Sequence, residues 1–127
     1  MVGSPVYFGG IAGGLKCLLD RVFYDAKRLF FYKPAAAVVT CRRGGAGNTF
    51  DQLNKYFTIK QMPVVASTYW NNVFGRVPGD ADGDAEGLAT MRNIGKNMAW
   101  LLRCIEAGQA AGINAPEADR ATTNFIR

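Results

Sequence analysis

The stretch that decides the fold is Lys33-Pro34-Ala35-Ala36-Ala37-Val38-Val39-Thr40-Cys41-Arg42-Arg43-Gly44-Gly45-Ala46-Gly47-Asn48. Residues 35–40 are small or β-branched without polar alternation, which is typical of a strand buried on both faces of a parallel sheet. The glycine-rich loop that follows can present successive backbone N–H groups to an anion or to a carbonyl edge. It lacks the Gly-Lys-Ser or Gly-Lys-Thr ending of a phosphate-binding P-loop. The stretch therefore predicts an α/β protein with a donor-rich loop after a central strand.

Toward the N-terminus the sequence predicts one helix and the end of one strand. Apolar residues recur at helical spacing over residues 13–24, which favours an amphipathic helix. Met1 and Val2 suit a strand but run directly into Gly3. We therefore expect only a stub of strand at this edge, followed by a loop.

Toward the C-terminus the sequence predicts one further strand and two helices. Asn48 or Thr49 can cap a helix whose apolar face follows at once. Residues 64–68 form a second buried run that Pro63 introduces, and glycine and proline breakers make the chain irregular up to residue 83. The clearest helix covers residues 84–107 and is expected to end at Gly108.

The order of these elements predicts a doubly wound parallel sheet in a three-layer α/β/α arrangement. We expect the domain to cover residues 1–112 and an arm or tail to cover residues 113–127. Ligands of such sheets bind beyond the carboxyl ends of the strands. Three loops are expected there, at residues 3–12, 41–48 and 69–83.

Composition limits the chemistry of the chain. It has 127 residues, of which 49% are hydrophobic, so it can form one domain with a true core. It has no histidine, which excludes a Ser-His-Asp or Cys-His nucleophile, a histidine general base and a His-ligated zinc ion. Cys17, Cys41 and Cys104 form no C-x-x-C pair and are expected to be buried thiols of a cytoplasmic protein. Chemistry must therefore come from a cofactor, from carboxylates or thiols, or from a partner.

The charge of the chain is unevenly distributed. The net charge is +5, and residues 1–60 contain nine Lys or Arg against three Asp or Glu. This imbalance favours an anionic ligand or partner on that side. No leader is evident, and no apolar run approaches the roughly 18 to 20 residues that span a bilayer, so we expect no membrane association.

An acidic run precedes the last predicted helix but does not fit a calcium loop. Counted from Asp80, the turn glycine expected at position six is Ala85, and the closing glutamate expected at position twelve is Met91. Negative charges before a helix N-terminus are a sufficient explanation. We predict no metal site.

Several motifs, taken in order, carry a resemblance that extends from Gly3 to about Gly112. They are Gly3-Ser4-Pro5-Val6-Tyr7, Leu18-Leu19-Asp20-Arg21, Arg42-Arg43-Gly44, Asp51-Gln52-Leu53-Asn54-Lys55-Tyr56-Phe57, Gln61-Met62-Pro63-Val64-Val65, Tyr69-Trp70-Asn71 and Asn97-Met98-Ala99-Trp100-Leu101-Leu102. With these motifs the chain resembles the NADPH-dependent FMN reductase family, a group of flavodoxin-like proteins whose relatives include iron-sulfur flavoproteins.

The resemblance implies a flavodoxin-like fold with FMN at the strand ends. It implies hydride transfer from NADPH or NADH to FMN, and onward to an acceptor such as a quinone, a free flavin or a nitro compound. It also implies a homodimer or homotetramer in which a neighbouring subunit helps to close each site, with no nucleic-acid partner. Because a flavin carries this chemistry itself, no catalytic side chain is assigned and no histidine is needed.

Carried over to this sequence, the resemblance assigns roles to all three loops. Residues 5–9 would lie along the isoalloxazine ring, and residues 42–45 would donate to its pyrimidine edge. Trp70 and Asn71 would wall the pocket from across a subunit interface. The full set of predicted cofactor-binding residues is Ser4, Pro5, Val6, Tyr7, Phe8, Gly9, Thr40, Arg42, Arg43, Gly44, Gly45, Trp70 and Asn71.

The sequence departs from the family in two ways. Phe74 precedes Gly75 where relatives often carry a histidine. The Ser/Thr/Asn-rich phosphate loop after the first strand is missing, since the sequence begins at the expected end of the third strand. We therefore expect a flavin reductase without its N-terminal phosphate-binding half.

Two alternatives stay open. The chain could be a truncated module that binds no FMN and serves an interaction or structural role. It could also be a basic nucleic-acid-binding domain, which is disfavoured because its positive residues are not gathered in one arm or helix.

Overall fold

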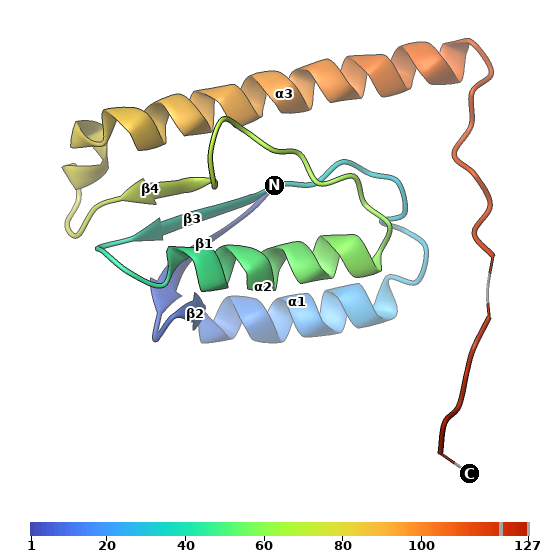
Figure 1. Ribbon diagram of the computed structural model, residues 1–127, viewed down its shortest axis with the longest axis horizontal. Coiled ribbons are helices and arrows are strands. Elements are labelled where there is room, and N and C mark those ends of the chain that lie inside the picture. The colour runs from blue at the N-terminus through green and yellow to red at the C-terminus, as the bar shows by residue number, and fades with distance from the viewer. Residues whose placement is uncertain (120, 127) are drawn as a thin grey trace.

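The computed structural model describes residues 1–119 and 121–126, and within them the chain alternates strands and helices (Figure 1). The elements are β1 (Val2–Tyr7), β2 (Gly10–Ile11), α1 (Gly13–Asp25), β3 (Ala37–Cys41), α2 (Ala46–Ile59), β4 (Asn72–Phe74), the 3-10 turn η1 (Asp80–Gly83) and α3 (Ala85–Ala110).

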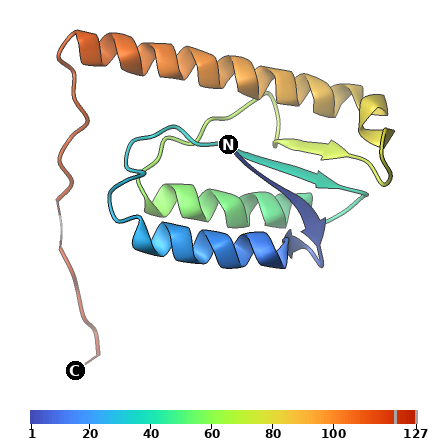
Figure 2. The same cartoon turned by 180° about the vertical axis from the view of Figure 1, so that it is seen from behind.

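The strands form one sheet in the order β2-β1-β3-β4. β1, β3 and β4 are parallel, and the short β2 pairs antiparallel with the end of β1. α1 and α2 cover one face of the sheet and α3 crosses the other (Figures 1 and 2). The predicted α/β fold with three parallel strands and a flavodoxin-like three-layer arrangement is confirmed.

The main core lies between the sheet and the pair α1 and α2. Ala37 and Val39 of β3 face this side and pack with Leu53 and Phe57 of α2. Small side chains on the central strand let the helices approach closely. Burying a Leu or Phe side chain of this kind contributes about 1.5 to 3 kcal/mol.

A smaller core lies on the opposite face. Ala36 of β3 packs there with Val65 and with Ile94 of α3. α3 is the sole helix on this face in the described part of the chain, and Gly3 and Pro5 of β1 are exposed. The strand ends near β1 are consequently accessible from this side.

The edge strand β1 is six residues long, so the prediction of a stub was wrong. The Val2 N–H donates to the Ala36 carbonyl at 2.9 Å, which turns the N–H groups of Val2 and Ser4 toward β3. By alternation the nitrogens of Gly3 and Pro5 face the outer edge. Proline is tolerated there because no ladder hydrogen bond is lost.

The prediction of a strand over residues 64–68 was also wrong. Val64 forms only a single bridge with Ala35, and pairing resumes at β4. Asn71 explains the interruption, because its side chain is 1% exposed and its Nδ2 donates to the Ala37 carbonyl at 2.9 Å. The Ser67 hydroxyl donates to Asn71 Oδ1 at 2.6 Å. A side chain thus replaces part of the ladder and lets residues 66–70 leave the sheet.

The start of α2 differs from the prediction. The helix begins at Ala46 after Gly45, whose φ is 86°, and neither Asn48 nor Thr49 is its N-cap. The Thr49 hydroxyl donates to the Gly45 carbonyl, and the Asn48 amide donates to the carbonyl of Gly9. Asn48 therefore binds the hairpin between β1 and β2, and Thr49 binds the carbonyl of the N-cap residue from within the helix.

The last helix was predicted closely at its start and less closely at its end. Asp84 is the N-cap of α3, and its carboxylate accepts from the Gly87 N–H at 2.8 Å. The helix passes through Gly108 and ends at Ala110. Gly112, with φ of 81°, adopts the left-handed conformation beyond it.

The three cysteines differ in exposure. Cys17 and Cys104 are exposed and Cys41 is buried, so the expectation of three buried thiols was wrong for two of them.

No α-helix among the described residues has the length and apolar character that a bilayer crossing demands. Residues 113–119 and 121–126 form neither helix nor strand and lead away from the domain (Figure 2), while Arg120 and Arg127 of the predicted arm lie outside the described residues.

Candidate functional site

A cleft of about 420 Å³ opens at the carboxyl ends of the parallel strands. Its walls are residues 5–7 from β1, residues 40–42 from the end of β3 and the segment 75–81 that follows β4. We call it the strand-end cleft. Its volume lies within the range of about 300 to 1,000 Å³ that small-molecule sites usually have.

The first wall is the hairpin between β1 and β2. Phe8 and Gly9 occupy its turn with φ of 50° and 73°, the positive values that a two-residue hairpin of type I′ requires. A phenylalanine in this conformation is strained, and such strain is found preferentially at functional sites. Tyr7 and Phe8 are both exposed. The hairpin thus presents two aromatic rings at the end of the sheet.

The hairpin is locked against the loop after β3. A Cβ on Gly45 would lie 2.8 Å from Val6 Cγ1 and 2.9 Å from Gly9 Cα. The hydrogen bond from the Asn48 amide to the Gly9 carbonyl joins the same two loops. Gly9 and Gly45 were predicted to contact a cofactor, but the close approach that they permit is between the loops. They position the walls of the cleft.

Two other predicted residues are internal. Ser4 is 3% exposed, and its hydroxyl accepts from the Ala12 N–H at 3.0 Å and donates to the Pro5 carbonyl at 2.7 Å. Asn71 is held in the sheet by the hydrogen bonds described above. Both side chains are thus engaged in hydrogen bonds within the domain, and their assignment to the cofactor stays a prediction.

The two neighbouring arginines diverge. Arg42 lines the strand-end cleft with Pro5, Val6, Tyr7 and Thr40. Arg43, Gly45 and Trp70 instead line a second cleft, of about 480 Å³, between the N-terminal ends of α2 and α3. We call this one the helix-end cleft; Asn72 lines it in place of the expected Asn71.

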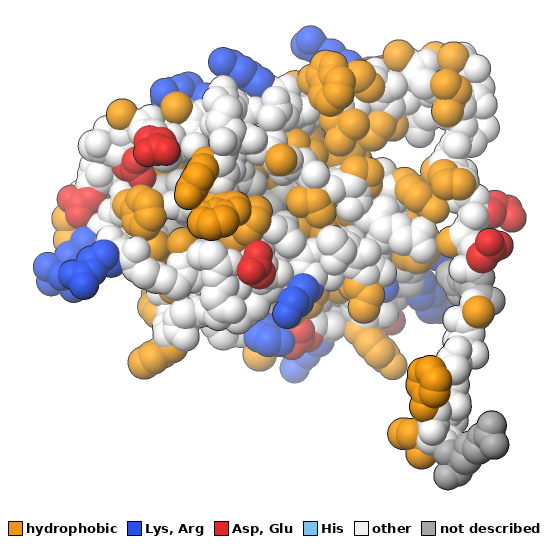
Figure 3. Space-filling model, viewed as in Figure 1, with side chains coloured by type: hydrophobic (Ala, Val, Ile, Leu, Met, Phe, Trp, Pro, Cys, Tyr) orange, Lys and Arg blue, Asp and Glu red, His pale blue; other side chains and the backbone are white. Residues whose placement is uncertain are grey.

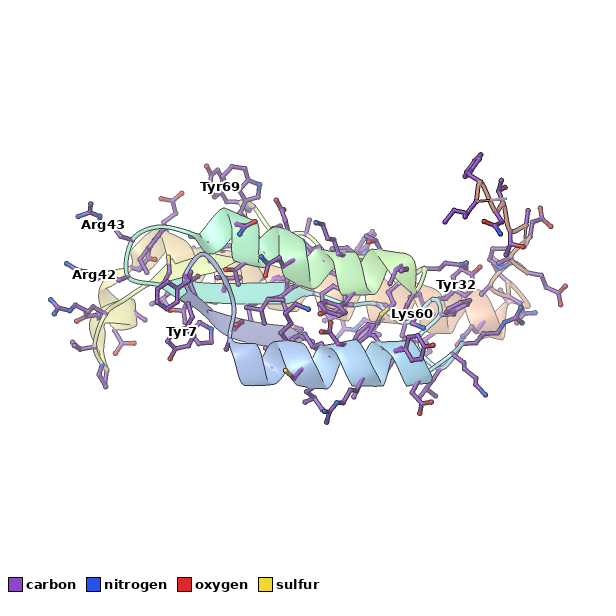
Figure 4. The ribbon with its side chains drawn as sticks, turned by 90° about the horizontal axis from the view of Figure 1, so that it is seen from below. Tyr7, Tyr32, Arg42, Arg43, Lys60 and Tyr69 are labelled. Atoms are coloured by element: carbon purple, nitrogen blue, oxygen red, sulfur yellow. The ribbon has the colours of Figure 1, made fainter. Side chains whose placement is uncertain are left out.

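Figure 4 shows Tyr7, Arg42 and Arg43 at one end of the domain, with Tyr32 and Lys60 at the opposite end. Arg43 lies on the side of Tyr69, and Arg42 lies closer to the side of Tyr7. Gly44 is exposed in the loop between β3 and α2. The structure therefore brings the predicted loops to one end of the molecule but divides their side chains between two clefts.

Arg76 is a lining residue that the sequence did not reveal. Its segment folds back over the cleft because Asp80 Oδ2 accepts from the N–H groups of Arg76 and Val77 at 2.9 and 3.0 Å. These bonds, the one from Val77 foremost, hold the pKa of Asp80 below its ordinary value of 3.8. Asp80 belongs to the acidic run seen in the sequence. A carboxylate that accepts from N–H groups preceding it in the chain has no fixed sequence pattern, so this contact could not be predicted from the run.

Asp84 holds the other end of this segment. Its Oδ2 accepts from the Phe74 N–H at 2.8 Å and its Oδ1 from the Gly87 N–H at 2.8 Å. The first of these bonds, followed by the second, lowers the pKa of Asp84. The acidic run thus serves backbone capping, and the described residues contain no group of three or more His, Cys, Asp or Glu side chains arranged for a metal ion.

The loop after β3 has N–H groups available to a ligand. Among the described residues, those of Arg42, Arg43 and Gly44 form no hydrogen bond, and α2 has no side-chain cap. Uncapped N–H groups and a helix N-terminus favour anionic or carbonyl acceptors. Arg42 and Arg76 add positive charge in the strand-end cleft.

A mostly parallel sheet with helices on both faces and a cleft at its strand ends is consistent with a flavodoxin-like α/β fold. The sequence pattern of the family described as NADPH-dependent FMN reductase matches residues 1–75. Because this match covers more than half of the chain, the protein belongs to that family.

Two curated relatives are iron-sulfur flavoproteins. One, from Methanocaldococcus jannaschii, is 37% identical over an alignment of 116 residues, and the match covers 84% of this chain and 59% of the relative. The other, from Methanosarcina thermophila, is 29% identical over an alignment of 111 residues, and the match covers 84% of this chain and 56% of the relative. The chain thus spans somewhat less than six-tenths of the length of these relatives.

Proposed function

We propose that the protein is an FMN-dependent NAD(P)H oxidoreductase whose flavin ring is held in the strand-end cleft. The reaction would take hydride from NADPH or NADH and pass the electrons to a quinone, a free flavin or a nitro compound. Membership of the FMN reductase family supports this proposal. The observation that carries it is the strand-end cleft itself, which Arg42, Arg76 and the exposed Tyr7 line at the carboxyl ends of parallel strands.

The residues of the cleft suit the ring system of FMN. Tyr7 offers an aromatic face beside a flat ligand. The free N–H group of Arg42, which lines the cleft, matches the carbonyl and nitrogen acceptors of a pyrimidine edge, and the free N–H groups of Arg43 and Gly44 follow it in the same loop. The donor set is therefore complementary to the electron-rich edge of the flavin.

When bound, FMN supplies the hydride-accepting chemistry, and the protein needs only to bind and orient it. Arg42 and Arg76 would stabilise negative charge at the electron-rich edge of the ring. The locked hairpin and the Asp80 bonds would fix the positions of these groups. Because the flavin would carry the redox chemistry and the protein would only bind and orient it, the absence of histidine from the sequence is compatible with this reaction.

We further propose a homodimer or homotetramer in the cytoplasm, without nucleic-acid or membrane partners. Trp100 and Leu102 on α3 are exposed, as are Phe125 and Ile126 of the C-terminal segment, and such side chains favour burial against another subunit. The three free thiols are typical of a reducing compartment.

Visible absorbance of the purified protein tests the proposal. We expect the chain to take up added FMN and the bound flavin to bleach when NADPH or NADH is added without oxygen. Protein that takes up no FMN would contradict the proposal and favour an interaction or structural module. Flavin that binds but is not bleached by either nicotinamide would contradict the NAD(P)H step alone.

A further inference from the structure

The segment after β4, residues 75–81, forms one wall of the strand-end cleft and brings a second arginine to it. Arg76 shares the cleft with Arg42, and among the described residues no Asp or Glu side chain lines it. By contrast, the helix-end cleft is lined by the carboxylates of Asp84 and Glu86. Figure 3 shows a group of basic side chains projecting at the end of the molecule where β3 and β4 terminate. The strand-end cleft is therefore the more favourable place for an anionic group.

The backbone of this segment is built on a tight turn. In Val77-Pro78-Gly79-Asp80 the Asp80 N–H donates to the Val77 carbonyl at 3.1 Å, and Gly79 has φ of 93°. A type II turn favours proline at its second position and glycine, which adopts a positive φ without strain, at its third. The turn thus gives residues 75–81 a defined conformation in the absence of a ligand.

Hydrogen bonds hold the backbone of Arg76 on both sides. The Gly75 N–H donates to the Cys41 carbonyl at 3.0 Å, which ties the segment to the end of β3. The Arg76 N–H and the next N–H along the chain donate to Asp80 Oδ2 at 2.9 and 3.0 Å. A Cβ on Gly75 would lie 3.1 Å from the Ala81 nitrogen, so the two ends of the segment are in close contact. Arg76 therefore leaves the backbone at a fixed point on the rim of the cleft.

The guanidinium of Arg76 is not neutralised by a neighbouring carboxylate. Asp80 is close to it in the sequence, but its carboxylate binds backbone N–H groups. The ion pair found within the described part of the chain joins Lys16 to Asp20, on α1. An unpaired guanidinium on an ordered segment is available to a ligand.

Two guanidinium groups exceed what the flavin ring alone needs. The pyrimidine edge of an oxidised flavin offers neutral acceptors, which backbone N–H groups and one arginine can satisfy. A phosphate carries a full negative charge, and the planar fork of a guanidinium can bind two of its oxygens at once. The second arginine therefore matches a phosphate group.

We propose that Arg76 binds a phosphate group of the ligand in the strand-end cleft, with Arg42 at the ring edge. This inference rests on the proposed function and deepens it, because it assigns the charge selectivity of the site to one residue. From its place on the rim, Arg76 also adds positive potential near the ring edge. Asp80 is a positioning residue, since it holds the backbone of Arg76. The phosphate is that of FMN or that of the nicotinamide dinucleotide, and the experiment separates these two sources.

Titrations with FMN and riboflavin, which differ only in the phosphate, test the flavin as the source. We expect Arg76→Ala to weaken FMN binding about fivefold to tenfold and riboflavin binding less than about twofold, as loss of one charge-assisted contact predicts. Arg42→Ala should weaken both flavins by the same factor. Asp80→Ala should lower the preference for FMN as Arg76→Ala does. Asp80→Asn should retain the preference, because its amide oxygen can still accept from both N–H groups.

Reduction of the bound flavin by NADPH and NADH tests the dinucleotide as the source. An unchanged preference for FMN, together with a KM for either dinucleotide that Arg76→Ala raises about fivefold at constant kcat, would assign the phosphate to the dinucleotide. Arg103→Ala removes an exposed charge on α3 and should behave as the unmodified protein does. Circular dichroism should show every variant folded.

The outcomes separate this inference from the proposed function. If Arg76→Ala and the unmodified protein bind both flavins equally well and have the same KM values, the role of Arg76 is overturned and the proposed function stands. Failure of the unmodified protein to take up either flavin would overturn both.

Discussion

The strand-end cleft and the helix-end cleft share one loop, residues 41–45, but are built differently. The strand-end cleft depends on backbone geometry: a strained hairpin, a glycine that permits close loop contact and a carboxylate that folds residues 75–81 back. The helix-end cleft depends on side chains set on helix ends and on an irregular loop. The two clefts are similar in size, but changes in backbone conformation should disrupt the first and changes of side chain should disrupt the second.

The consecutive arginines make this comparison concrete. Arg42 lines the strand-end cleft and Arg43 the helix-end cleft. A sequence motif groups them because they are adjacent, but the chain turns between them as it leaves the sheet. Substitutions at these adjacent positions should therefore alter different clefts.

The largest expected effect is on the close contact between the β1–β2 hairpin and the loop after β3, which Gly45 permits and which we call the lock. Gly45→Ala places a Cβ within 2.9 Å of both Val6 and Gly9 and imposes a left-handed conformation on alanine. We expect a loss of about 2 to 4 kcal/mol in the free energy of unfolding, combining overpacking with backbone strain.

The matched control for this lock is Gly44→Ala. A Cβ at Gly44 meets nothing within 4 Å, so urea denaturation should show a change of less than about 0.5 kcal/mol, as at most surface positions. Equal destabilisation by the two variants would contradict the lock.

The next effect separates Asn71 from Asn72. Asn71→Ala removes the donor to the buried Ala37 carbonyl, and we expect destabilisation of about 1 to 3 kcal/mol. Asn72→Ala removes an amide that lines the helix-end cleft and forms no hydrogen bond within the described residues, so it should change stability little. Thermal and urea unfolding of both variants checks this, and a reversed order of stability would break the distinction between structural and lining amides.

The smallest effect concerns Asp84, which borders the helix-end cleft. Hydrogen bonds from Phe74 and Gly87 lower its pKa in the folded state, so its stabilisation is fully present above the ordinary value of 3.8. It is lost as the pH falls through the lower folded value. Asp84→Ala should therefore lower the melting temperature at neutral pH, and the difference from the unmodified protein should shrink below pH 3.8. Asp82→Ala is the exposed control, and a pH-independent difference at Asp84 would contradict this cause.

Elements with a strong periodic signal were predictable from the sequence. The apolar run of β3 and the helical spacing of α1 and α3 gave the layers and their order, because burial on a sheet or helix face constrains residue type directly. The positions of the three loops at one end of the sheet followed from the parallel arrangement.

Features that depend on single tertiary hydrogen bonds were not predictable. Pro5 is compatible with β1 only because its nitrogen faces the outer edge, and β4 is displaced because the Asn71 amide takes over part of the ladder. Tertiary hydrogen bonds also decide which residues line the candidate site. Arg76 joins the strand-end cleft through Asp80, and nothing in the local sequence specifies that bond.

The most direct test of the account is FMN affinity measured by titration for Arg42→Ala and Arg43→Ala in parallel. The account predicts about a tenfold loss of affinity for Arg42→Ala, from removal of a charge-assisted contact, and less than about a twofold change for Arg43→Ala. Equal losses in the two variants, or a larger loss in Arg43→Ala, would contradict the assignment of the flavin to the strand-end cleft.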